Sequence, residues 1–145
     1  MKVIFDTSVI VASLVTSHPS HDRAFPWLSK VKSGDIEMIV ACHSLAETYA
    51  VLSTLPLSPR ITPILAWRLV HENIETAATL ISLSASDYSA VIRRMGERGL
   101  SGGIIYDMIV VMAAEKEGVD RLLTLNTRDF IRIWPEGKNR ILSLL

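Results

Sequence analysis

Short apolar runs alternate with segments that carry helix signals along nearly the whole of this chain. The runs that predict strands cover residues 2–5, 37–41, 79–83, 121–125 and 141–144. Such alternation is typical of an α/β fold, because a parallel strand is reached from its neighbour through a helical crossover. The pattern therefore predicts a three-layer α/β/α sandwich with a mostly parallel sheet, and 145 residues suit one domain over 1–145.

Helix start signals follow most of these runs. The expected helices begin near residues 6, 21, 44, 58, 84 and 104. Ser44 is expected to cap the third helix, Ser58-Pro59 to open the fourth, and Ser84 with Asp87 to form a capping box for the fifth. An apolar stripe is expected on the fourth helix, made of Ile64, Leu65, Leu69 and Ile74. The segment 134–139 is expected to be a loop.

The composition indicates a small apolar protein with balanced charge. Hydrophobic residues make up 49% of the chain, which favours an apolar surface kept for a partner or a second copy. The formal net charge of zero argues against an extended basic surface that binds nucleic acid. It allows a small acidic pocket with local arginines. The single cysteine, Cys42, indicates a reducing cytoplasm, and no apolar stretch reaches the length of a membrane span.

Three carboxylates stand almost alone in apolar sequence. Asp6, Glu47 and Asp107 are the only charged residues within 3–21, 38–59 and 99–114. Acids in such segments are drawn toward the interior, where an unpaired carboxylate costs several kcal/mol. If the three converge they also repel one another, and a divalent metal between them would offset both effects.

The expected fold brings these acids to one edge of the sheet. Asp6 directly follows the first strand, Glu47 is expected in the first turn of the helix after the second strand, and Asp107 lies early in the helix after a Gly-Gly pair. Asn126 follows the strand 121–125, with Asp129 three residues later. Ligands of parallel sheets bind beyond the carboxyl ends of the strands, so these oxygens are candidates for one site.

Each of these residues also has a local structural explanation. Asp6 could be an N-cap worth about 1 kcal/mol. Glu47 could complete a capping box with Ser44, and Asp107 could favour the positive end of its helix dipole. Asn126 with Asp129 could form another cap pair. Caps require neither isolation from other charges nor a shared edge, so the whole set favours a site.

At this point the motifs resemble a known family. Asp6-Thr7-Ser8 after the first strand, Glu47 in the second βα unit, and 103–107 opening an apolar helix look like a PIN-domain ribonuclease. The run 123–130 is similar to the Thr-x-Asn-x-x-Asp-Phe block of that family. The motifs occur in the family's order over nearly the whole chain, and its length resembles the VapC-type toxins of toxin–antitoxin pairs.

The resemblance implies an Mg²⁺- or Mn²⁺-dependent endoribonuclease acting on RNA, commonly a homodimer, silenced by an antitoxin segment beside the acidic pocket. Asp6, Glu47 and Asp107 match the metal-binding acids, with Glu47 either a ligand or the group that orients water. Asn126 and Asp129 match the final block, as outer or second-metal contacts. An oxygen-rich site selects hard cations, and such a cation would activate a water and stabilise the leaving oxygen.

Two other functions are compatible with the sequence. A phosphatase or phosphotransfer domain could use Asp6 as nucleophile, although Ser8 stands where a second aspartate is expected. A non-catalytic interaction module could keep the fold without binding metal. For the ribonuclease, the candidate contacts to RNA phosphates are Arg93, Arg94, Arg98 and Arg128.

Overall fold

The computed structural model describes residues 1–144 and contains a five-stranded sheet of order β3-β2-β1-β4-β5. The strands are β1 (Lys2–Phe5), β2 (Glu37–Ala41), β3 (Thr79–Ile81), β4 (Arg121–Thr124) and β5 (Ile141–Ser143). Every neighbouring pair is parallel. All five predicted strands are present, although β3, β4 and β5 end one or two residues early.

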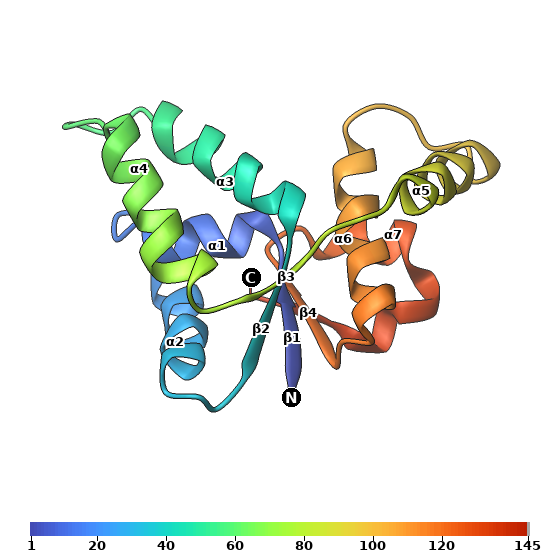
Figure 1. The fold of residues 1–145 in the computed structure, drawn as a ribbon, viewed down its shortest axis with the longest axis horizontal. Helices are drawn as coiled ribbons and strands as arrows, with labels where there is room; N and C mark the ends of the chain where they lie inside the picture. Colours follow the sequence, from blue (N-terminus) through green and yellow to red (C-terminus); the bar gives the residue numbers. More distant parts are fainter. Residues whose placement is uncertain (145) are drawn as a thin grey trace.

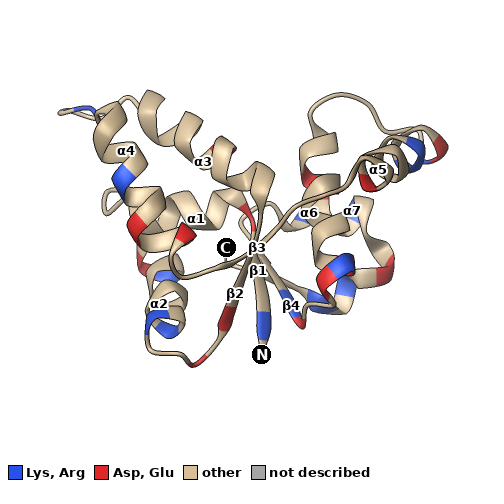
Figure 2. Cartoon of the chain, viewed as in Figure 1, with Lys and Arg blue, Asp and Glu red and all other residues tan. Residues whose placement is uncertain are grey.

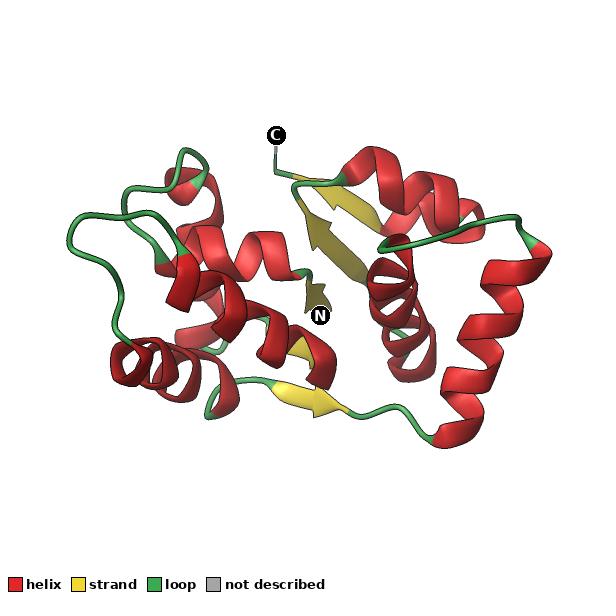
Figure 3. Cartoon of the chain, turned by 90° about the horizontal axis from the view of Figure 1, so that it is seen from above, coloured by secondary structure: helices red, strands yellow, loops and turns green. Residues whose placement is uncertain are grey.

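The helices cover both faces of this sheet and so confirm the three-layer architecture. The helical segments are α1 (Thr7–Leu14), α2 (His21–Lys32), α3 (Cys42–Thr54), α4 (Pro63–Val70), the π-helical η1 (His71–Glu75), α5 (Ala85–Glu97), α6 (Ile104–Glu117), α7 (Thr127–Ile133) and the 3₁₀ helix η2 (Pro135–Arg140). Helices α1 to α4 lie on one side and α5 to α7 on the other (Figure 1). The view from above separates the same two groups (Figure 3).

The central strand β1 has an apolar core on each of its faces. Its side chains alternate, so Val3 and Phe5 pack with α1 and α2, while Ile4 packs with α6. All three are fully buried. Burial on both faces is the reason why β1 reads as a continuous apolar run. It also fixes the carboxyl end of β1, and with it Asp6, between the two helical layers.

The capping box of Ser84 and Asp87 is confirmed at the start of α5. The Asp87 N–H donates to Ser84 Oγ at 3.1 Å, and the Ser84 N–H donates to Asp87 Oδ2 at 2.8 Å. Helix α6 ends before Gly118, which takes the left-handed conformation at φ 67°.

Two predicted helix starts are wrong. Helix α3 begins at Cys42, two residues before Ser44, which is buried inside the helix and caps nothing. Helix α4 begins at Pro63, after Thr62, whose Oγ1 accepts from the Leu65 N–H at 3.3 Å. A threonine cap with proline at the first helical position is a complete start signal, and it outcompetes Ser58-Pro59 upstream.

The predicted apolar stripe of Ile64, Leu65, Leu69 and Ile74 is correct only for Leu69, which packs against the core, and for Ile74. Ile64 and Leu65 are 64% and 43% exposed, whereas Ala66, Val70 and Ile74 are buried. The three buried positions are spaced by four residues, so they form one face of the helical segment. Three large apolar side chains, Ile64, Leu65 and Trp67, are therefore left on the surface of this helix.

The segment 134–139 is not a loop, since η2 forms a 3₁₀ helix there. Trp134 is 2% exposed and packs in the core beside Phe130 and Ile133. Gly137 allows the helix to pass close over this indole, because a Cβ on it would stand 2.1 Å from Trp134 Cδ2. Among the described residues, no helix is both long and apolar enough to cross a bilayer.

Candidate active site

A cavity of about 350 Å³ opens at the carboxyl ends of the strands. In Figure 1 this edge of β1 lies between α3 and α6. The lining residues are Asp6, Thr7, Ser8, Val11, His18, Glu47, Val51, Leu55, Asp107 and Asn126. Four of the five predicted site residues therefore meet in one cavity. Asp129 is exposed on α7 and is not among the residues that line it.

Asp6 is held by a hydroxyl network instead of serving as a helix cap. It occupies the N-cap position of α1, but its side chain makes no capping hydrogen bond. Its Oδ2 accepts from Ser8 Oγ at 2.8 Å and from Thr124 Oγ1 at 3.0 Å. The carboxylate is only 4% exposed, and burial raises its pKa although the two hydroxyls act in the opposite direction. Asp6 is therefore the N-cap residue by position, as expected, but its carboxylate does not cap the helix.

The same network fixes Asp6 to the end of β4. Ser8 Oγ accepts from the Leu125 N–H at 3.1 Å, and Thr124 Oγ1 accepts from the Asn126 N–H at 2.8 Å. The position of Asn126 is thus coupled to that of Asp6 through one hydroxyl. The role of Thr124 was not predicted, because it lies inside an apolar strand.

Glu47 points into the cavity from the second turn of α3, not from the first turn as expected. It accepts a hydrogen bond from Thr7 Oγ1 at 3.1 Å, and its Oε1 lies 3.7 Å from His43 Nε2. The early start of α3 removes the capping box with Ser44. Glu47 is therefore free to serve the cavity, joined to α1 through Thr7.

Asp107 lies in the first turn of α6 and carries the clearest electrostatic signal. Its pKa is raised from 3.8 to about 7, first by burial and then by the negative charges of Asp6, Asp129 and Glu47. A helix N-terminus would lower this pKa, so burial and like charge outweigh the helix dipole. Asp129 thus belongs to the electrostatic field of the site although it does not line the cavity.

An unpredicted aromatic contact joins the two helical layers beside these acids. The rings of His43 on α3 and Tyr106 on α6 stack with centroids 4.8 Å apart and an angle of 7°. The sequence held one signal for His43. It precedes Glu47 by four residues, and this spacing puts both side chains on one helix face. His18 lines the cavity and was not predicted as a site residue, because its loop position gave no signal.

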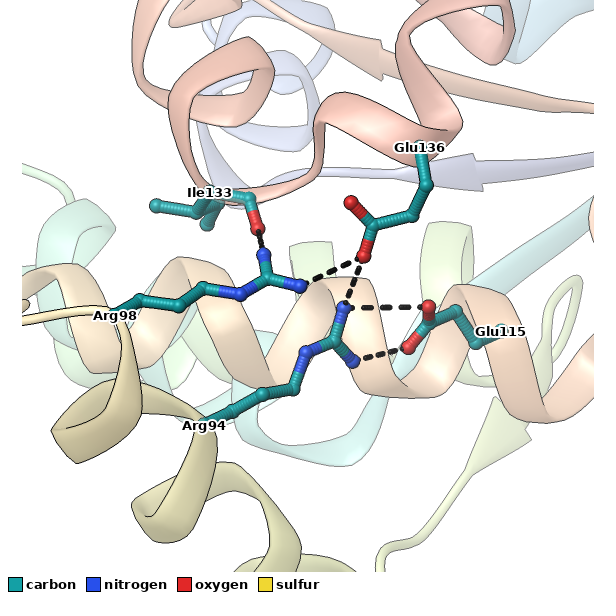
Figure 4. Close-up of polar contacts among 5 residues, drawn as sticks. All are labelled: Arg94, Arg98, Glu115, Ile133 and Glu136. Atoms are coloured by element: carbon teal, nitrogen blue, oxygen red, sulfur yellow. Dashed lines mark hydrogen bonds and ion pairs between the residues drawn. The ribbon is translucent and has the colours of Figure 1, made fainter.

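Three of the four candidate arginines are occupied away from the cavity. Arg94 and Arg98 both contact Glu136, at 3.0 and 2.8 Å, and Arg94 also pairs with Glu115 (Figure 4). Arg98 further donates to the Ile133 carbonyl. These contacts attach α5 to α6 and η2.

Arg93 pairs with Glu97 along α5 at 2.8 Å. Arg128 is exposed beside Asn126, and within residues 1–144 it has no ion pair. Charged residues are frequent on α5 and α7 and sparse on α1 and α3 (Figure 2). Arg128 is therefore the candidate that is left for a contact to RNA.

The donor set fits a hard divalent cation. The cavity offers carboxylate and amide oxygens, and no lysine or arginine lines it. Within the described part of the chain, no three His, Cys, Asp or Glu side chains already form a group that could hold a metal ion. Mg²⁺ usually keeps several waters and takes one or two protein carboxylates, a requirement that Asp6 and Asp107 can meet without a third acid.

Comparison of the sequence with known proteins assigns the chain to a family. The family model described as PIN domain matches residues 3–133. Ribonuclease VapC40 of Mycobacterium tuberculosis is 33% identical over 125 residues, 85% of either chain. Ribonuclease VapC27 of the same species is 35% identical over 124 residues, 86% of this chain and 82% of its own. This chain therefore belongs to the PIN-domain family of nucleases, among the VapC ribonucleases.

Solved structures agree on the fold. VapC20 of Mycobacterium tuberculosis, described as a sarcin–ricin loop cleaving toxin, has a TM-score of 0.65 at 16% identity, over 83% of this chain and 86% of its own. VapBC2 from Rickettsia felis, bound to a promoter DNA fragment, has a TM-score of 0.64 at 20% identity, over 92% and 93%. The predicted family and fold are thus confirmed. Nucleases of this family generally depend on a metal ion.

The raised pKa of Asp107 predicts how pH changes the stability of the metal-free protein. Between its ordinary value of 3.8 and about 7, the folded protein binds more protons than the unfolded chain, so stability falls as pH rises through this range. In EDTA, we expect the Tm of the wild type to fall relative to that of Asp107→Asn as pH rises from about 5 to about 8. Added Mg²⁺ should reduce the difference in Tm between the two proteins near pH 8. Parallel Tm curves for the two proteins would contradict the assigned environment of Asp107.

Proposed function

We propose that this cavity is the centre at which the protein cleaves RNA phosphodiester bonds with the help of Mg²⁺ or Mn²⁺. The observation that carries the proposal is the convergence of Asp6, Glu47 and Asp107 on one cavity that no lysine or arginine lines. The raised pKa of Asp107 agrees with this convergence. Such a set of oxygens is costly unless a cation occupies it. The family relationship supports the same chemistry.

Each residue has a role that its contacts support. Asp6 and Asp107 would hold the metal, and Ser8 with Thr124 would fix the orientation of Asp6. Glu47 would serve as a further ligand or orient the attacking water. When bound, the metal would supply activation of water and stabilisation of the leaving oxygen.

Asn126 and Asp129 would act at the rim of the site. The backbone of Asn126 is held by Thr124, so its side-chain amide is presented at the edge of the cavity. Asp129 would act through its charge on Asp107 or through a second cation. This division leaves Asp6, Glu47 and Asp107 as the residues required for cleavage.

The proposal includes a toxin–antitoxin role in the cytoplasm. Structural relatives are toxin–antitoxin complexes, such as VapBC2 from Rickettsia felis and a complex from Klebsiella pneumoniae. This chain exposes Trp67 and Ile64 on α4 and Ile92 on α5, apolar side chains suited to an antitoxin segment or a second copy in a homodimer. The one cysteine, Cys42, is free, in keeping with a reducing compartment.

The test is cleavage of RNA by the purified protein in a titration of Mg²⁺ and Mn²⁺. We expect endonucleolytic products that require the metal and disappear in EDTA. Cleavage of equal rate in EDTA, or no cleavage of any RNA at any concentration of either metal, would contradict the proposal. Mixing with the product of an adjacent small gene tests the antitoxin separately.

Arg128 is expected to contact an RNA phosphate. Arg128→Gln should raise KM for RNA about fivefold with little change in kcat, and should reduce the salt dependence of binding by about one counterion. Arg121→Gln is the matched control, because Arg121 is exposed at the amino end of β4, on the opposite edge of the sheet. Equal effects of the two substitutions would show that only overall charge matters.

A further inference from the structure

The cavity has two chemically different sides. The acids lie near the starts of α1, α3 and α6, whereas the lining residues further along the chain in α1 and α3 are apolar: Val11, then Val51 and Leu55 at the end of α3, with His18 from the loop after α1. These four residues form the second side. This second side has no charged group other than a potential charge on His18. A phosphate would find no fixed cation there, so a neutral and partly apolar group suits it better.

The apolar side is a firm surface because a packed cluster lies behind it. Val11 is 5% exposed and packs with Leu52, Ala66 and Val70, which are all buried. These residues come from α1, α3 and α4, which lie together on one side of the sheet (Figure 1). Close packing of this kind keeps a wall in place before a ligand arrives.

His18 adds one oriented hydrogen-bond donor to this wall. Its Nδ1 accepts from the Ser20 N–H at 3.0 Å, which places the ring proton on Nε2. Its own backbone N–H donates to the Val15 carbonyl at 3.0 Å, so the loop holds the residue at two points. The ring therefore offers an N–H donor at the cavity, next to aliphatic side chains.

We propose that this side of the cavity binds the nucleobase of a nucleotide that flanks the cleaved phosphodiester, with His18 donating to an acceptor on the base edge. A base has apolar faces for Val11, Val51 and Leu55, and acceptor atoms on its edge for Nε2–H. It is linked covalently to the phosphodiester that would be cleaved beside the acids, and a cavity of about 350 Å³ is in the size range of small-ligand sites. The inference rests on the proposed cleavage of RNA and makes His18 a specificity-determining residue.

Binding can be tested without catalysis by NMR of the four histidine rings in metal-free protein. The probes are nucleosides, nucleoside 5′-monophosphates and inorganic phosphate. We expect the His18 ring signals to shift with nucleosides and monophosphates but not with phosphate, while His71, exposed on η1, does not respond. Shifts with inorganic phosphate alone would indicate an anion site and overturn the proposal, as would no shift of His18 with any nucleoside.

Specificity is tested by sequencing the cleavage products of a randomised RNA. His18→Ala should weaken the preference at one nucleotide beside the cut about 5- to 10-fold, the effect of one lost hydrogen bond. His18→Gln, which keeps an N–H donor, should restore part of it, and His71→Ala is the matched control. An unchanged profile in His18→Ala would overturn the base subsite while leaving the cleavage function intact. Absence of metal-dependent cleavage in the wild type would instead reject the proposed function, and the NMR titration would still decide on the subsite.

Discussion

Replacing Asp6 by asparagine is expected to reduce metal-dependent RNA cleavage at least about 100-fold, beyond the 10- to 100-fold typical of losing a residue that only supports a metal ligand. The substitution keeps the shape of the side chain and removes the charge that the cation needs. Because burial already disfavours that charge, the metal-free variant should be at least as stable as the wild type. Initial cleavage rates and Tm measured on the same preparation check both statements.

The matched control is Asp35→Asn. Asp35 is exposed in the turn before the amino end of β2, at the edge of the sheet opposite the cavity, and its carboxylate accepts from Ser33 Oγ. We expect its cleavage rate to equal that of the wild type. Retained cleavage by Asp6→Asn, or a loss that is matched by unfolding, would remove Asp6 from the catalytic group.

The second large effect is expected for Gly137→Ala, which should lower the free energy of unfolding by about 2–4 kcal/mol. A methyl group on Gly137 would stand 2.1 Å from two atoms of the Trp134 indole, which is itself buried. Neither side can yield easily, since the indole is enclosed by the core and the Gly137 backbone belongs to η2. Thermal or denaturant unfolding measures the loss.

Gly96→Ala is the control for the same chemical change. Gly96 lies in the last turn of α5, and a Cβ there meets no atom within 4 Å. This substitution should be neutral or stabilise by up to about 1 kcal/mol, because alanine is the better helix former. Equal effects of the two substitutions would show that the contact between Gly137 and Trp134 is looser than described.

The parts of the fold that could be predicted are those set by local chemistry or by burial on both faces. The strands 2–5 and 37–41 are predicted to the residue, because a strand covered by helices on both sides reads as a continuous apolar run. The box of Ser84 and Asp87 is predicted correctly because both partners lie within one turn. The failures occur where two plausible helix starts compete, as at Ser58 and Thr62.

The residues that line the site were easier to predict from the sequence than the hydrogen bonds that hold them. Isolation in apolar sequence indicated Asp6, Glu47 and Asp107, and their positions after strands brought them to one cavity. The partners of Asp6 could not be predicted in full, since Thr124 is 118 residues away and meets it only through the pairing of β1 with β4. His18 was missed for a similar reason, because a loop residue gains its place only from the tertiary fold.

Calorimetric titration of Mn²⁺ and Mg²⁺ into the wild type and into Asp107→Asn is the most direct test of a single cation site formed by these acids. At about pH 8, above the pKa of about 7 for Asp107, the wild type is expected to bind the metal saturably and Asp107→Asn to bind it at least about tenfold more weakly. Lowering the pH to about 5.5 should weaken binding to the wild type far more than to the variant, because protons compete for Asp107. Equal affinity of the two proteins, or no binding to the wild type, would contradict a metal centre built from Asp6, Glu47 and Asp107.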